Sequence, residues 1–221
     1  MRAQDFTQQL DEASYVDPEI TQILKIKGFR KLGAGVDQAA YLAPTGQAVL
    51  KIFGGGYRGN IGQITRDQRM FMVWAEYCAA NAGNPFLPRF LPGEGGKPWA
   101  PFDFDGRRYL QIWQERLYPL PEEISDDISD FAYLVRKWGA DDVIAAAKQG
   151  RGKFSLLTPG MRGIKDFLIP TVGRSGFELL VQTIDELAKI AFKNGYRLDL
   201  HGGNWLRRRN DDIVIVDPWV V

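Results

Sequence analysis

The stretch over residues 196–218, YRLDLHGGNWLRRRNDDIVIVDP, constrains the fold more than any other part of the sequence. Two short apolar runs, 205–206 and 213–216, are joined by the polar segment RRRNDD, and this pattern predicts a small β-hairpin. Since a hairpin returns the chain to the edge where it began, the flanking residues Asn204 and Asp217 are expected to lie close together.

The same stretch holds the groups that phosphoryl transfer requires. A carboxylate must accept or orient the proton of the attacking group, and a carboxylate and an amide must hold Mg²⁺ against the phosphates. Asp199, Asn204 and Asp217 supply these side chains, and Mg²⁺ prefers their hard oxygen atoms. The stretch therefore favours a phosphotransferase.

Helices are predicted before this stretch. Ser175 followed by Glu178 forms a capping-box pattern, apolar residues then share one face, and Gly195 marks the end. Residues 125–138 predict a second amphipathic helix, and 141–148 extend or follow it. Residues 150–174 carry weak signals.

The first half of the chain is richer in strand patterns. Strands are predicted over 29–32, 39–43, 47–53 and 108–113, with a short helix within 1–25, a helix over 66–82, and the Pro- and Gly-rich segment 84–106 wrapping the surface. Strands, then helices, then a hairpin indicate an α+β protein with two lobes. We expect these lobes to be residues 1–113 and 114–221.

Further features appear in a fixed order. Gly33-Ala34-Gly35 separates the first two predicted strands, and Lys51 lies within the VLKI run of the third. Glu76 stands on the following helix, with Asp67 as an alternative acidic residue, and the strand pattern YLQIWQERL covers 109–117.

In this order the features resemble the catalytic core of the protein-kinase-like superfamily. Asp199-x-x-x-x-Asn204 resembles the kinase catalytic loop, and Asp217 resembles the aspartate of the D-F-G motif. The resemblance implies ATP and Mg²⁺ as cofactors, Asp199 as the catalytic carboxylate, and Asn204 and Asp217 as metal ligands. It also implies a two-lobed kinase-like fold.

The resemblance assigns nucleotide-binding roles in the first half as well. Gly33 and Gly35 would belong to the loop over the phosphates, and Lys51 would contact the α- and β-phosphates. Glu76 would pair with Lys51. Glu115 or its neighbours would offer backbone groups to adenine.

Some positions depart from the superfamily pattern. Gln38 replaces the third glycine, Leu198 replaces the arginine of H-R-D, and Pro218 follows Asp217. The sequence ends at Val221, so the later helices of ordinary protein kinases are expected to be missing and the C-lobe truncated.

Two kinase groups match the catalytic loop more closely. His201 occupies the position where aminoglycoside kinases usually have histidine, and small serine/threonine kinases of some bacteriophages share the D-x-H-x-G-N and D-P patterns. We expect His201 to hydrogen-bond the loop backbone rather than to act chemically. Arg207-Arg208-Arg209 predicts a solvated turn, with a docking patch for acidic partners as the alternative.

Three functions remain open at this point. The first is a phage-type protein serine/threonine kinase acting on host proteins. The second is a small-molecule kinase, with a cationic substrate held by an acidic pocket of Asp126, Asp127, Asp130, Asp141 and Asp142. The third is a pseudokinase that binds and blocks another protein, and the presence of Lys51, Asp199, Asn204 and Asp217 argues against it.

Composition limits the partners and the compartment. The net charge of +1, from 28 basic and 27 acidic side chains, gives no reason to expect nucleic acid or an anionic membrane as partner. Cys78 is the single cysteine, and the first residues contain no hydrophobic signal core. We expect a cytoplasmic protein, in the host cytoplasm if the chain is phage-encoded.

Overall fold

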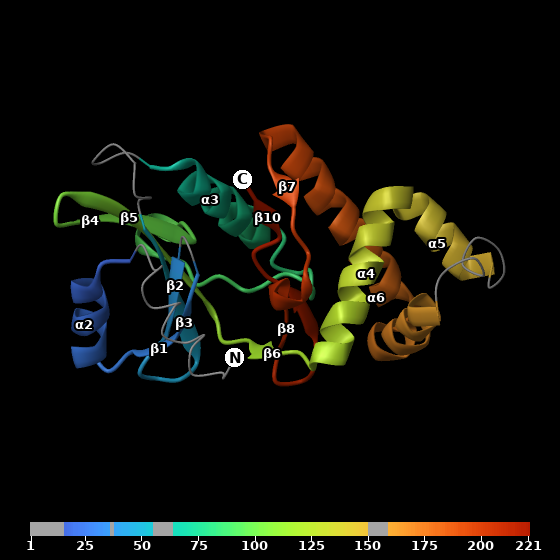
Figure 1. Cartoon of the computed structure of the whole chain (residues 1–221), viewed down its shortest axis with the longest axis horizontal. Coiled ribbons are helices and arrows are strands. Elements are labelled where there is room, and N and C mark those ends of the chain that lie inside the picture. The colour runs from blue at the N-terminus through green and yellow to red at the C-terminus, as the bar shows by residue number, and fades with distance from the viewer. Residues whose placement is uncertain (1–15, 36–37, 55–63, 150–158) are drawn as a thin grey trace, which may run out of the picture. The chain divides into compact units, whose positions relative to one another are not determined.

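The computed structural model describes residues 16–35, 38–54, 64–149 and 159–221. The chain divides into two compact units, of which unit 1 comprises 1–83 with 88–116 and unit 2 comprises 84–87 with 117–221. Both units combine helices with antiparallel strands, which confirms the predicted α+β class (Figure 1). In this division unit 1 ends at residue 116, one residue after the end of strand β5.

Unit 1 contains a five-stranded antiparallel sheet in the order β1-β2-β3-β5-β4. Its elements are α2 (Pro18–Ile26), β1 (Arg30–Ala34), β2 (Gln38–Leu42), β3 (Ala48–Phe53), α3 (Arg66–Ala80), η1 (Glu94–Gly96), β4 (Trp99–Phe104) and β5 (Arg107–Glu115). The predicted strands at β1, β2, β3 and β5 and the helix at α3 are confirmed within a few residues.

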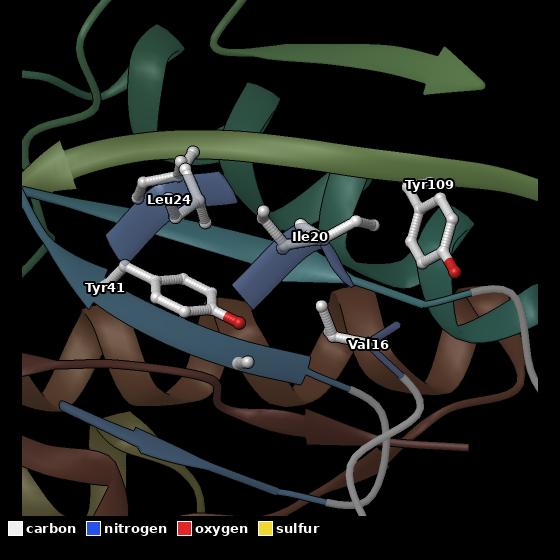
Figure 2. Close-up of a cluster of buried hydrophobic side chains, with 8 residues drawn as sticks. Val16, Ile20, Leu24, Tyr41 and Tyr109 are labelled. Carbon is white, nitrogen blue, oxygen red and sulfur yellow. The ribbon is translucent and has the colours of Figure 1, made fainter. Parts of the chain in front are cut away.

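Helix α2 covers one face of this sheet. Asp17 caps the helix by accepting a hydrogen bond from the Glu19 N–H at 2.8 Å, and Pro18 occupies the first turn, where its missing N–H costs nothing. Ile20 and Leu24 point from the helix toward Tyr41 of β2 (Figure 2). This contact forms a buried apolar cluster on the α2 side of the sheet.

Helix α3 covers the opposite face. The rings of Phe53 and Phe71 lie 4.0 Å apart, and neighbouring Ile52 belongs to the α2 side, as alternation along β3 requires. Gln68, fully buried, donates its amide hydrogens to the Phe53 and Arg108 carbonyls, both at 3.2 Å. Because Gln68 also completes the Thr65 capping box, the start of α3 is fixed to two strands.

Strand β4 was not predicted, because residues 84–106 read as irregular. The strand is at the edge of the sheet and pairs only with β5 among the described strands. An edge strand tolerates proline, since the missing N–H faces away from the ladder. Pro101 therefore sits within β4, opposite Leu110, where a central strand would exclude it.

Unit 2 is built from helices and two small sheets, in the orders β10-β7 and β6-β8-β9. Its elements are β6 (Tyr118–Pro119), α4 (Glu122–Trp138), α5 (Ala140–Gln149), α6 (Pro159–Asn194), β7 (Arg197–Leu198), η3 (Gly202–Asn204), β8 (Trp205–Arg207), β9 (Ile213–Ile215) and β10 (Trp219–Val220). The predicted helices at α4 and α5 and the predicted hairpin of β8 and β9 are confirmed.

The core of unit 2 forms where α4 packs on α6. Phe131 and Phe177 have ring centroids 5.5 Å apart, and the predicted apolar faces of both helices are buried. Helix α6 starts earlier than the predicted start at Ser175, but Gly173 (φ 72°) interrupts its helical backbone close to that residue. Gly195 (φ 70°) ends α6 as predicted.

The segment 84–87 lies between the two sequence ranges of unit 1 but belongs to unit 2. The Ile215 N–H donates to the Phe86 carbonyl at 2.8 Å. The Arg208 guanidinium donates to the Pro85 and Leu87 carbonyls at 2.5 and 2.8 Å, and Arg208 is buried. The prediction of a solvated turn is therefore wrong for Arg208, although Arg209 is exposed.

Candidate active site

Two short strand pairs bring the predicted catalytic-loop residues together in unit 2. Strands β7 and β10 pair Leu198 with Trp219, and the Asp199 N–H donates to the Pro218 carbonyl at 2.7 Å. At the other end, the Val216 N–H donates to the Asn204 carbonyl at 2.8 Å. Asp199 and Asn204 are thus hydrogen-bonded to the two residues that flank Asp217, which is the proximity expected from the sequence.

Two tryptophans fix the backbone around these residues. The Trp205 indole N–H donates to the Leu200 carbonyl at 3.1 Å, and the Trp219 indole N–H donates to the Leu187 carbonyl of α6 at 3.0 Å. Both rings are buried. Trp205 thus holds the loop after β7, and Trp219 ties strand β10 to helix α6.

Asn204 is buried at the end of η3, and its amide is oriented by the loop. Its Nδ2 donates to the Asp199 carbonyl at 2.6 Å. Because the nitrogen is used in this way, the amide oxygen is the atom that Asn204 can offer to a cation. This geometry fits the predicted role of Asn204 as an oxygen ligand.

Asp217 has a left-handed backbone conformation with φ 48°. Only Asp, Asn and Gly adopt this region at low cost, and strained residues of this kind concentrate at functional sites. The proline at position 218 follows in the β7-β10 connection. The backbone requirement alone would allow glycine or asparagine at position 217, so it does not explain why a carboxylate stands there.

His201 contacts the backbone of the loop, as predicted. Its Nδ1 accepts a hydrogen bond from the Gly203 N–H at 3.1 Å, which caps η3. Its Nε2 lies 3.7 Å from the Asp199 Oδ2, and the two side chains are 63% and 39% exposed. Sequence reasoning included Gly203 only as the glycine of the D-x-H-x-G-N pattern and gave it no role of its own.

In unit 1, the predicted phosphate-binding residues lie in one row of the sheet. The register places Gly33 opposite Ala40, and Ala40 opposite Lys51. Two strand spacings separate Gly33 from Lys51, which corresponds to about 10 Å. This row puts small residues on β2 and β1, on one side of the lysine, whereas Ile112 of β5 lies opposite Lys51 on the other side.

The described residues show no structural reason for glycine at positions 33 and 35. Neither Gly33 nor Gly35 has a positive φ, and a Cβ added at either position would meet no atom within 4 Å. Space above a glycine-rich turn is what the backbone approach to a phosphate needs. Positions 36 and 37, between these glycines and β2, lie outside the described residues.

Lys51 is buried, with 8% of its surface exposed, on the face of β3 that α3 covers. Glu76, its predicted partner, lies on an exposed side of α3, and its carboxylate accepts a hydrogen bond from the Trp99 indole at 3.0 Å. Position 75, one residue earlier and buried, is alanine. The structure thus gives Glu76 a different partner, and the pair with Lys51 stays a prediction.

Glu115 ends β5 and contacts the chain next to it. Its N–H donates to the Arg89 carbonyl and its carboxylate accepts from the Arg89 N–H, both at 2.9 Å. The Arg116 N–H donates to the Gln47 carbonyl at 3.1 Å. A contact to adenine from this segment would therefore use carbonyl groups or the residues that follow, because these two N–H groups are already bonded.

The metal prediction rests on one carboxylate and one amide. Within the described ranges, no three His, Cys, Asp or Glu side chains gather as a metal site. A Mg²⁺ ion held by one or two protein side chains together with substrate phosphates needs no such group. Asp217 and Asn204 fit this second type of site.

A separate acidic cavity of about 750 Å³ lies between α4, α5 and α6. Its carboxylates are Asp141, Asp142, Asp185 and Glu186, and Asp185 forms an ion pair with Lys189 at 2.5 Å. This hydrogen-bonded carboxylate raises the pKa of Lys189. The predicted acidic pocket is correct for Asp141 and Asp142, whereas Asp126, Asp127 and Asp130 do not line the cavity.

Comparison with protein families and with curated proteins finds no relative. No protein-family model matches the sequence, and no curated protein matches it significantly. None of the helices described is both long and apolar enough to cross a membrane.

Proposed function

We propose that this protein is an ATP- and Mg²⁺-dependent phosphotransferase with a kinase-like arrangement of catalytic residues. The observation that carries the proposal is the convergence of Asp199, Asn204 and Asp217 on the hydrogen bonds between β7, β10 and the β8-β9 hairpin. A proton acceptor beside two hard oxygen ligands is the minimum that phosphoryl transfer requires.

Unit 1 supports the nucleotide part of the proposal. Lys51, a buried residue, has small residues in its row on β1 and β2, and there is open space above Gly33. A lysine in such surroundings suits the α- and β-phosphates of ATP. Carbonyl groups near Glu115 are the candidate contacts for adenine.

The reaction follows from these assignments. The oxygen of an acceptor hydroxyl forms a bond to the γ-phosphorus of ATP, and the bond from that phosphorus to the β-γ bridging oxygen breaks. The bridging oxygen keeps the electron pair and leaves as part of ADP, and the hydroxyl proton passes to the Asp199 carboxylate. Bound Mg²⁺ would neutralise phosphate charge, held by Asn204 and Asp217.

The acceptor we favour is a serine or threonine hydroxyl of a protein, in the host if the chain is phage-encoded. This choice rests on the D-x-H-x-G-N and D-P patterns of the sequence. The acidic cavity favours a second candidate, a cationic small molecule with a hydroxyl group, because its carboxylates exceed its single lysine.

Phosphate transfer to two different acceptors separates these candidates. The protein is incubated with γ-labelled ATP and Mg²⁺, once with bacterial lysate and once with an aminoglycoside. Label on lysate proteins would support the protein kinase, and label on the aminoglycoside would support the small-molecule kinase. Binding of ATP·Mg²⁺ without transfer to either acceptor would contradict catalysis and favour a pseudokinase.

A further inference from the structure

His201 and Gly203 form a matched pair in the loop after β7. A Cβ added at Gly203 would lie 2.9 Å from the His201 Cε1 and 3.3 Å from Nδ1. Carbon atoms do not approach so closely without a shift. Since Gly203 has no positive φ, its backbone conformation does not require glycine, and a side chain at this position would displace the imidazole.

The hydrogen bond within this pair sets the tautomer of the ring. The Gly203 N–H donates to Nδ1, so Nδ1 must be unprotonated. A neutral imidazole then carries its proton on Nε2. That nitrogen lies 3.7 Å from the Asp199 Oδ2, which places an N–H donor beside the carboxylate.

The backbone of Asp199 is held at the same time by two other contacts. Its N–H donates to the Pro218 carbonyl at 2.7 Å, and its carbonyl accepts from the Asn204 amide at 2.6 Å. These bonds fix the backbone of Asp199 and do not restrict rotation of its carboxylate about the side-chain bonds. His201 approaches the carboxylate itself, with Nε2 3.7 Å from Oδ2.

We propose that His201 is a positioning residue for Asp199: Gly203 fixes the imidazole in the Nε2–H tautomer, and Nε2–H then orients the carboxylate through Oδ2. This inference rests on the proposed function. With Oδ2 directed to His201, Oδ1 is the oxygen presented to the acceptor hydroxyl. His201 touches neither phosphate nor acceptor, so it affects turnover through the orientation of Asp199.

An imidazole ¹⁵N spectrum tests the placement without any enzyme assay. The chain contains one histidine, so its ring signals need no assignment. At alkaline pH we expect a protonated Nε2 and an unprotonated Nδ1, a shift of the Nε2 signal in Asp199→Asn, and loss of this single tautomer in Gly203→Ala. Gly83→Ala is the matched control, since its added Cβ meets nothing within 4 Å. An Nδ1–H tautomer, or a spectrum unchanged in both loop variants, would overturn the proposal.

Kinetics test the consequence for Asp199. His201→Leu and Gly203→Ala should each lower kcat by about 10- to 100-fold with little change in the KM for ATP, because a misplaced catalytic group slows the chemical step. His201→Asn should recover most of the rate, since its amide can accept from the Gly203 N–H and donate to Asp199. A His201→Leu variant with the wild-type kcat would overturn the proposal. If the wild type transfers no phosphate, the proposed function fails and the ¹⁵N spectrum alone decides the placement of His201.

Discussion

At the scale of single residues, the backbone conformation of Asp217 does not account for its charge. Its φ of 48° can be adopted by Asp, Asn or Gly, so the backbone does not specify a charge. Under the proposed function, the Asp217 carboxylate would hold a cation together with the amide oxygen of Asn204, whose backbone carbonyl accepts a hydrogen bond from Val216, the residue before Asp217.

We predict that Asp217→Asn keeps the fold but loses Mg²⁺-dependent nucleotide binding. Asparagine tolerates the same φ, so the free energy of unfolding should change little, whereas the charge that holds the ion is removed. Isothermal titration with ATP in the presence and absence of Mg²⁺ measures the effect. Wild-type affinity for ATP·Mg²⁺ in this variant would refute the assignment of Asp217 as metal ligand.

The residues of the candidate site were predictable where one motif contained them. The spacing of Asp199, Asn204 and Asp217 around a hairpin was sufficient to predict their proximity, because a hairpin's ends meet by construction. The partner of Glu76 was not predictable from spacing. The helical position of Glu76 is exposed and points its carboxylate to Trp99, which belongs to a strand that the sequence did not reveal.

At the scale of elements, the β8-β9 hairpin is held by the buried side chain of Arg208. Arg208 donates to the Pro85 and Leu87 carbonyls and thereby attaches the segment 84–87 to the hairpin that separates Asn204 from Asp217. A charged donor with two carbonyl acceptors leaves both acceptors unpaired when it is removed.

We predict that Arg208→Ala lowers the free energy of unfolding by about 1–3 kcal/mol, whereas Arg209→Ala changes it by less than about 0.5 kcal/mol. Arg209 is the matched control because it is the next residue and is exposed. Urea unfolding followed by tryptophan fluorescence measures both. Equal values for the two variants would show that the guanidinium contacts of Arg208 do not stabilise the hairpin.

Two buried tyrosines, on the face of the sheet that α2 covers, should make the stability of unit 1 fall at alkaline pH. Burial raises the pKa of Tyr41, against the opposing effects of its Thr21 hydrogen bond and the charge of Lys31, and burial also raises the pKa of Tyr109. The folded state therefore favours the neutral phenols. Their contribution is complete below the unfolded pKa of about 10 and is lost as the pH rises above that value.

We predict that the free energy of unfolding falls above about pH 10, and that Tyr41→Phe makes this fall shallower. The variant loses the hydrogen bond between Tyr41 and Thr21, so it should be less stable than the wild type at neutral pH. Tyr133→Phe, at an exposed residue of α4, is the control and should keep the wild-type slope. An unchanged slope in Tyr41→Phe would contradict the assignment. Urea unfolding at a series of pH values provides the measurement.

Elements with a clear pattern in their own sequence were predictable, whereas elements that form through contacts with the rest of the fold were not. Strands β2, β3 and β5 have apolar runs, and β1 was predicted from the glycines that follow it. Strand β4 contains a proline and is formed because it adds to the edge of β5. The first part of α6, before Gly173, lies in residues with weak helical signals, and local sequence alone did not predict it.

At the scale of the whole molecule, the proposed reaction assigns residues from both units. Lys51, Gly33 and Gly35 belong to unit 1, and Asp199, Asn204 and Asp217 belong to unit 2. The α+β class was predictable from the order of strands and helices. The acceptor was not, because the acidic cavity combines residues of three helices whose packing the sequence does not specify.

The most direct test of the account is the initial rate of phosphate transfer from γ-labelled ATP, measured for wild type, Asp199→Ala, Lys51→Ala and Asp130→Ala with the same acceptor. Asp130 is the control, an exposed carboxylate of α4. The account predicts transfer by wild type and Asp130→Ala, and rates lower by about 100-fold or more in the other two variants. Full transfer by Asp199→Ala, or none by wild type with any acceptor, would contradict it.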